Sequence, residues 1–228
     1  MKKLKKAYIL NICIFALEVL AIAWMTSGIS LFSGRRVLSA SSFRMLKYFT
    51  VDSNILMGIA ALIAALDLRK VLRGEKSEVS LSALLWKLAG TVSVTLTLLV
   101  TVFFLVPTAD YNPLALFTNS NLLLHLINPI VSIITFVCFE KSGKISFRHT
   151  FTGIIPMLLY AVYYVEEALR HTSNGMISAG YDWYGFFFLG VKSAYVVLPL
   201  VILITWLISL ALWKLNRTGS KRSESPLS

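Results

Sequence analysis

The stretch RMLKYFTVDSNILMGIAALIAAL, from Arg44 to Leu66, decides the fold, because it places polar residues at the start of an otherwise apolar helix. Thr50, Ser53 and Asn54 have the i, i+3, i+4 spacing of one helical face. A polar face in lipid is costly unless it points toward protein or water. We therefore expect this helix to turn its polar face into a helix bundle, where the face would form part of a site.

The composition of the whole chain indicates an integral membrane protein. Hydrophobic residues make up 57% of the 228 residues and charged residues only 14%, whereas about 25% of a typical soluble domain is charged. Several apolar segments approach the roughly 20 residues needed to cross a bilayer. They cover approximately residues 7–26, 43–66, 83–106, 119–139, 150–168 and 186–213. The sequence thus predicts an all-α polytopic bundle of six transmembrane helices in residues 1–215, followed by a polar, disordered tail, 216–228.

The N-terminal segment has two interpretations. Lysines precede its apolar run, as in a signal peptide. Asn11 and Glu18 interrupt the apolar core, however, and the run is long enough to cross a bilayer. We expect a retained first transmembrane helix.

The positive charge of the chain indicates topology. The formal net charge is +11, but the basic residues lie at the ends of the apolar segments, which argues against a nucleic-acid partner. Most lysines and arginines lie in the N-terminus, the linkers 67–87 and 141–148, and the C-terminus. Positive residues favour the cytoplasmic side of a membrane, so we expect both termini to be cytoplasmic in a cell membrane. The basic pair Arg35 and Arg36 is the exception to this pattern.

The two cysteines carry no metal or disulfide signature. Cys13 and Cys138 lie in or near apolar segments and have neither a CxxC spacing nor a Cys/His ligand spacing. We predict no metal site and no cofactor.

Polar residues gather at one predicted depth. At 1.5 Å per residue, Thr50 and His125 each lie roughly 10 Å below the outer surface. We also expect Glu18 and Lys192 to neutralise each other as a buried pair in the same half of the membrane. Tyr160 and Tyr163 fall in that half too.

This polar layer contains the residue types of an active site. A threonine hydroxyl needs a base to take its proton, and a neutral histidine suits that task. The hypothesis assigns Thr50 as nucleophile and His125 as base, with amide and phenol donors to stabilise an oxyanion. The candidate substrate-binding or orienting residues are Ser53, Asn54, Asn121, Asn128, Tyr160, Tyr163 and Glu167.

Three motifs occur together in order: KYFTVDSNIL, LLHLINPI and GIIPMLLYAVYYVEEALR. The set resembles the bacterial branch of the androgen-induced and androgen-dependent TFPI-regulating protein family of six-helix membrane proteins. The resemblance implies an intramembrane threonine hydrolase of lipid-like esters, with the nucleophile at Thr50 and the histidine at His125.

Two other interpretations remain open. The same polar layer would serve a non-enzymatic transporter or lipid-binding protein, or it would be the satisfied polar core of a structural membrane protein. Neither an internal repeat nor an interrupted helix, which are typical of transporters, is evident in the sequence.

Overall fold

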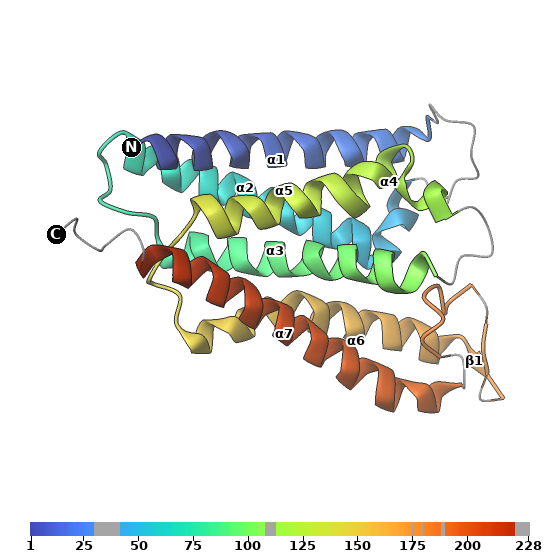
Figure 1. Cartoon of the computed structure of the whole chain (residues 1–228). Helices are drawn as coiled ribbons and strands as arrows, with labels where there is room; N and C mark the ends of the chain where they lie inside the picture. Colours follow the sequence, from blue (N-terminus) through green and yellow to red (C-terminus); the bar gives the residue numbers. More distant parts are fainter. Residues whose placement is uncertain (30–41, 108–112, 175, 179, 188–189, 222–228) are drawn as a thin grey trace.

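The computed structural model is all-α and describes residues 1–29, 42–107, 113–174, 176–178, 180–187 and 190–221. Long helices lie side by side, and the start of α1 and the end of α7 share one end of the bundle (Figure 1). We call this end of the bundle the termini end. The opposite end, which carries the short strands, is called the hairpin end. The predicted all-α class is therefore confirmed.

The long helices are α1 (Lys2–Ser27), α2 (Phe49–Leu72), α3 (Leu81–Val100), α6 (Ile155–Arg170) and α7 (Ala194–Lys221). A further rod joins α4 (Ser120–Leu122), the π-helical turn η4 (Leu123–Ile127), α5 (Asn128–Ile134) and a second π-helical turn, η5 (Thr135–Phe139). A π-helical turn, η2 (Thr101–Leu105), continues α3, and the 3₁₀ helices are η1 (Ser42–Lys47), η3 (Pro113–Phe117), η6 (Phe147–Ile154) and η7 (Val191–Ser193). Strands β1 (Thr172–Ser173) and β2 (Met176–Ile177) pair antiparallel.

Four helical segments of the described chain are long and apolar enough to cross a membrane: Lys2–Ser27, Leu81–Leu105, Ser120–Phe139 and Val191–Arg217. The fold is thus that expected of a membrane protein.

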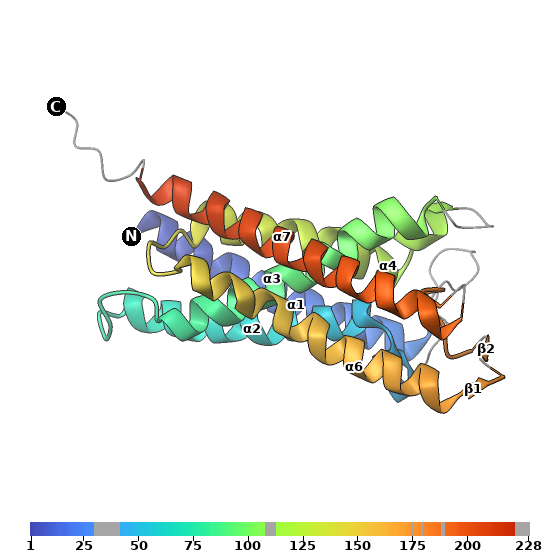
Figure 2. The same cartoon turned by 90° about the horizontal axis from the view of Figure 1, so that it is seen from below.

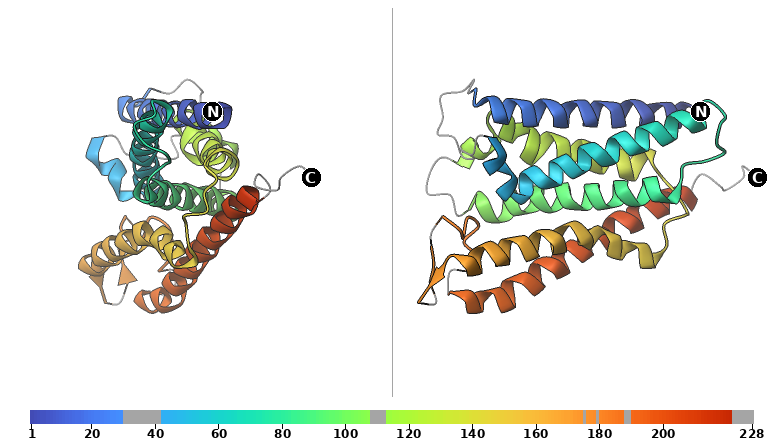
Figure 3. Two further views of the ribbon diagram at one scale, coloured as in Figure 1. Left: turned by 90° about the vertical axis from the view of Figure 1, so that its left-hand side faces the viewer. Right: turned by 180° about the vertical axis from the view of Figure 1, so that it is seen from behind.

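The helices form two groups. Helices α1, α2, α3 and the rod through α5 pack around one interior, while α6 and α7 lie beside α3 (Figure 1; end-on in Figure 3). Figure 2 shows α7 running along most of the length of the bundle, whereas α6 lies toward the hairpin end. Small residues allow close packing: a Cβ on Gly58 would lie 3.2 Å from the Glu18 Cβ, and one on Gly153 would lie 2.5 Å from Ser209 Oγ.

Two predicted boundaries are corrected. Residues 43–48 do not belong to the second long helix, because Tyr48 is extended (φ −99°, ψ 124°) and separates η1 from α2. Helix α7 continues to Lys221, whereas the sequence predicted a polar tail from residue 216 onward. Residues 222–228 lie outside the described residues.

The linker after α2 folds back onto that helix. The apolar part of α2 ends at Leu66, and Asp67 then accepts hydrogen bonds from Lys76 Nζ and from the Ser80 N–H (2.6 Å). Burial alone would raise the pKa of Asp67, but these hydrogen bonds and the Lys76 charge outweigh it and hold the pKa below its usual value. Ser80 in turn caps α3 by accepting from the Ala83 N–H (3.3 Å).

Candidate functional site

A cleft of about 1090 Å³ lies at the hairpin end, between η1 with the first turns of α2 and one face of α6. We call it the α2–α6 cleft. From α2 it is lined by Phe49, Asp52, Ser53 and Leu56, which follow the i, i+3, i+4, i+7 spacing of one helical face. Opposite them, α6 contributes residues at the same spacing. These are Pro156, Leu159, Tyr160, Tyr163 and Glu167.

Aromatic hydroxyl groups hold the walls of the cleft together. Tyr160 Oη donates to the Lys47 carbonyl (2.6 Å) and accepts from Trp183 Nε1 (2.9 Å). Tyr184 Oη accepts from the Phe49 N–H (2.9 Å), one of the first N–H groups of α2, which have no partner within the helix. The Tyr160 predicted from sequence therefore docks α6 and the 180–187 segment onto the start of α2.

The cleft is charged at one end and apolar at the other. Arg44 and Lys47 line its outer part on η1, and the Lys47 ammonium lies 5.0 Å from the Tyr48 ring and 5.5 Å from the Trp183 ring. Both distances allow a cation–π contact. Toward the middle of the bundle, Leu56 on α2 and Leu159 on α6 form an apolar part.

Asp52 lies between these two ends. Its side chain is partly exposed, and among the residues that the structure describes none donates a hydrogen bond to its carboxylate or forms an ion pair with it. An unpaired, half-buried carboxylate is available to a ligand group that donates a hydrogen bond. Asp52 is not among the predicted site residues, because it lies well round the helix from Thr50. Its spacing to Phe49, Ser53 and Leu56 is the signal in the sequence for a second polar face.

Thr50 lies behind the cleft wall. Its side chain is buried and lines a separate cavity of about 30 Å³, large enough for about one water molecule. Phe49 and Tyr160 line both this cavity and the α2–α6 cleft, so they form the partition between them. Thr50 is therefore adjacent to the cleft without lining it.

His125 is buried in the π-helical turn η4. Its Nδ1 lies 2.8 Å from the Leu116 carbonyl oxygen. Because a carbonyl can only accept, Nδ1 carries the proton, and Nε2 is the nitrogen of the neutral ring that can accept one. Within the described part of the chain, no hydrogen bond joins His125 to Thr50.

Asn54 links the two predicted catalytic helices. Its Nδ2 donates to the Thr50 carbonyl (2.6 Å) and to the Leu124 carbonyl (3.2 Å). The Leu124 carbonyl is free for this bond, because the Asn128 N–H reaches back to Leu123 and Pro129 has no N–H. The proline and the π-helical turn thus create the acceptor that Asn54 satisfies.

The other predicted residues divide between the cleft and the core. Ser53 lines the cleft, but its hydroxyl also bonds to the Thr50 carbonyl (3.0 Å) and to Thr97 Oγ1 (2.9 Å). Asn128 is buried and its Nδ2 donates to Glu18 Oε2 (2.7 Å). Asn121 is buried on α4, away from the residues that line the cleft.

The predicted pair of Glu18 and Lys192 is wrong. Lys192 is exposed on η7, whereas Glu18 is buried on α1 and bonded to Asn128. Instead of Lys192, the buried basic residue whose charge acts on Glu18 is Lys87. In the sequence, Lys87 stands at the end of the predicted basic linker 67–87.

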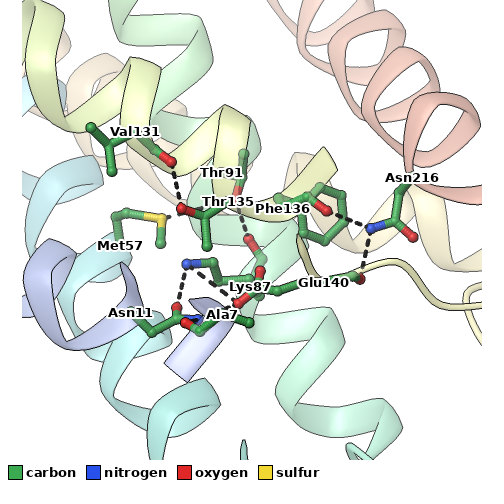
Figure 4. A network of polar contacts seen from close by, with 10 residues as sticks. All are labelled: Ala7, Asn11, Met57, Lys87, Thr91, Val131, Thr135, Phe136, Glu140 and Asn216. Carbon is green, nitrogen blue, oxygen red and sulfur yellow. Dashed lines mark hydrogen bonds and ion pairs between the residues drawn. The ribbon is translucent and has the colours of Figure 1, made fainter. Parts of the chain in front are cut away.

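A second polar cluster at the termini end was not predicted. Lys87 is fully buried on α3, where Nζ donates to Asn11 Oδ1 (2.5 Å) and lies 3.8 Å from Glu140 Oε1 (Figure 4). Asn11 Nδ2 also donates to Glu140, and Asn216 Nδ2 donates to the Glu140 carbonyl (2.9 Å). Polar residues therefore occupy more than one depth in the bundle. In the sequence, the positions of Asn11 and Glu140 within or beside apolar runs were the available signal for this second cluster.

Comparison of the chain with known protein families, with curated proteins and with solved structures finds no match. The fold and composition define the class as an all-α protein, in which four helical segments of the described residues are able to cross a membrane. The resemblance to the androgen-induced protein family stays a prediction.

Proposed function

We propose that the chain is a six-span protein of the cell membrane that binds a single-chain, phospholipid-like amphiphile in the α2–α6 cleft. Helix α2 has 24 residues, and η6 with α6 covers 147–170, so both are long enough to complete the set of spans. Both ends of the described chain lie at one end of the bundle, as an even number of spans requires (Figure 1). The basic residues near these ends favour cytoplasmic termini.

The observation that carries the proposal is the unpaired Asp52 carboxylate between a cationic rim and an apolar floor. Arg44 and Lys47 would bind a phosphate or carboxylate head group, and Leu56 and Leu159 would contact the chain. Leu159 is 68% exposed on the side of the bundle, so an acyl chain would enter laterally from the bilayer. Asp52 would accept a hydrogen bond from a hydroxyl or amine at the junction of head group and chain.

Native mass spectrometry of the purified full chain tests this proposal with lysophosphatidylglycerol and its analogue lacking the 2-hydroxyl. Asp52→Ala should weaken binding of the hydroxylated lipid about 10-fold or more, because a hydrogen bond to a charged group contributes about 1.5–3 kcal/mol. The same substitution should leave binding of the analogue unchanged. Glu75→Gln, which removes an exposed carboxylate outside the cleft, is the matched control.

Equal loss for both lipids, or no loss for either, would contradict the role of Asp52. Lys47→Met separates the head-group contact from the Asp52 contact, because it should weaken both lipids alike. If Lys47→Met and Asp52→Ala both leave binding intact, the cleft is not the lipid site.

Hydrolysis of a lipid-like ester at Thr50 and His125 is the second candidate function. It is favoured by the His125 tautomer, which leaves Nε2 as a base, and by the Asn54 bridge between the two helices. The Phe49–Tyr160 partition would have to open for an ester in the cleft to reach the Thr50 hydroxyl. Hydrolysis of the same lysophospholipid by wild type, and its loss in Thr50→Ala, would distinguish an enzyme from a binding protein.

A further inference from the structure

Glu18 occupies a place where an ionised carboxylate is poorly accommodated. It is buried on α1 where α1 approaches α2 at Gly58, and Oε2 accepts from Asn128 Nδ2 at 2.7 Å. Two atoms of this pair, Glu18 Oε1 and Asn128 Oδ1, are buried and find no hydrogen-bond partner within the part of the chain that the structure describes. Buried polar atoms almost always have a hydrogen-bond partner, so the lack of one at both oxygen atoms requires an explanation.

The orientation of the Asn128 amide follows from its neighbours. Asn54 Nδ2 donates to two carbonyl groups, so the Asn54 oxygen must be the atom that faces Asn128. Asn128 then presents its NH₂ group to Asn54 Oδ1 (3.5 Å) and to Glu18 Oε2. The Asn128 oxygen is left as an acceptor that needs a donor.

One proton on Glu18 Oε1 would satisfy both unpaired atoms. A carboxylate oxygen and an amide oxygen can only accept, but a protonated carboxyl donates. A carboxylic acid and an amide can close a ring of two hydrogen bonds, N–H to one carboxyl oxygen and O–H to the amide oxygen. The existing 2.7 Å bond between Asn128 Nδ2 and Glu18 Oε2 is one half of such a ring.

The charges in the bundle interior support the same conclusion independently. Glu18, Lys87 and Glu140 are buried, and Lys87 lies 3.8 Å from Glu140 but, among the residues that the structure describes, forms no ion pair with Glu18. If both carboxylates were ionised, the interior would contain one unbalanced negative charge, which is costly in a low dielectric. Among the described residues, the two that contact the Glu18 side chain from α2 and α5, Gly58 and Asn128, are both neutral.

We propose that Glu18 is a proton-binding site inside the bundle, held as a carboxylic acid by the Asn128 amide. With this proton bound, Lys87 and Glu140 form a neutral pair and the interior has no net charge. The site is linked through Asn128 and Asn54 to the Thr50 carbonyl, in the first turn of α2. This proposal does not depend on which ligand occupies the α2–α6 cleft.

Infrared spectroscopy of the full chain in lipid nanodiscs at about pH 7 tests it, with the glutamate carboxyls labelled with carbon-13. A protonated carboxyl has a C=O stretch well separated from the carboxylate bands, and the label shifts that stretch downward. We expect wild type to show a label-sensitive protonated band and Glu18→Gln to lack it. Glu166→Gln, which removes an exposed carboxylate paired with Arg170, is the matched control and should keep the band.

Glutamine at this position can donate to Asn128 Oδ1 and accept from Nδ2, so Glu18→Gln should fold. Asn128→Leu gives a second readout, because loss of the acceptor should move the carboxyl band to higher frequency. Absence of the band in wild type, its survival in Glu18→Gln, or an unchanged frequency in Asn128→Leu would each overturn the proposal.

Discussion

Replacement of Lys87 by methionine should destabilise the protein more than almost any other single substitution. The Lys87 ammonium is fully buried, donates to Asn11 Oδ1 at 2.5 Å and lies 3.8 Å from Glu140 Oε1 (Figure 4). Methionine has a similar length and apolar stem, so the loss is mainly electrostatic. Removing one partner of a buried ion pair costs about 3–5 kcal/mol, because the other charge stays buried. This is a large part of the about 5–15 kcal/mol that stabilises a typical protein.

A double-mutant cycle with Glu140→Gln tests the coupling. Glu140→Gln alone should cost less than Lys87→Met, because Glu18 can release its proton and balance the Lys87 charge. The double variant should be more stable than Lys87→Met alone, with a coupling free energy of at least about 1 kcal/mol. The assay is equilibrium unfolding in mixed micelles, followed by tryptophan fluorescence. As a control, Lys70→Met on the exposed surface should change the free energy of unfolding by less than about 0.5 kcal/mol. If the stability losses of Lys87→Met and Glu140→Gln simply add in the double variant, the reasoning is refuted.

Three further predictions concern other parts of the chain. Asp67→Asn should cost about 1 kcal/mol at neutral pH. Because the pKa of Asp67 is lowered in the folded state, the stability that Asp67 contributes is present above about pH 4 and is lost as the pH falls through the folded pKa. The stability of the variant should therefore depend less on pH in the acid range than that of wild type. Gly153→Ala should cost about 1–3 kcal/mol by overpacking, since the new Cβ would meet a side chain of α7, whereas Gly143→Ala has nothing within 4 Å and should be nearly neutral in thermal unfolding. If the chain is a hydrolase, Thr50→Ala and His125→Ala should each abolish lysophospholipid hydrolysis, with little further loss in the double variant; full activity in folded Thr50→Ala would exclude it as nucleophile.

The helices could be predicted from the apolar runs, because each run covers about the same residues as the helix that it forms. The segment predicted over 119–139 is found as a continuous helical rod, Ser120–Phe139. Its two π-helical turns were not predictable in the same way. They depend on which carbonyl each N–H reaches, and Pro129 gives only a partial signal for that choice.

The contacts of the polar residues were much less predictable than their presence. Matched depth placed Glu18 and Lys192 together, but depth gives no information about the angle around each helix or about which helices are neighbours. Lys87 was assigned to a linker because lysine usually marks the end of a span. The structure buries it by supplying Asn11 and Glu140 from segments far away in the sequence.

The same limit applies to the site. Thr50 and Asn54 were correctly expected to face the bundle interior, and both are buried. The face with Asp52 could have been recognised from its helical spacing, but the cleft exists only because Tyr160 and Trp183 bring α6 and the 180–187 segment to the start of α2. Tertiary contacts of this kind leave no local periodicity in the sequence.

Asn54 gives the most specific test of how the two predicted catalytic helices are joined. Asn54→Ala removes the donor to the Thr50 and Leu124 carbonyls and should cost about 1–3 kcal/mol, because two buried acceptors lose a partner. Pro129→Ala restores a backbone N–H next to the π-helical turn, and this N–H can reach the Leu124 carbonyl. The double variant should therefore lose less stability in the micelle unfolding assay than the sum of the two single variants. If the two effects are simply additive, the Leu124 carbonyl is not the acceptor that Asn54 was needed to satisfy, and the bridge between α2 and η4 must depend on packing instead.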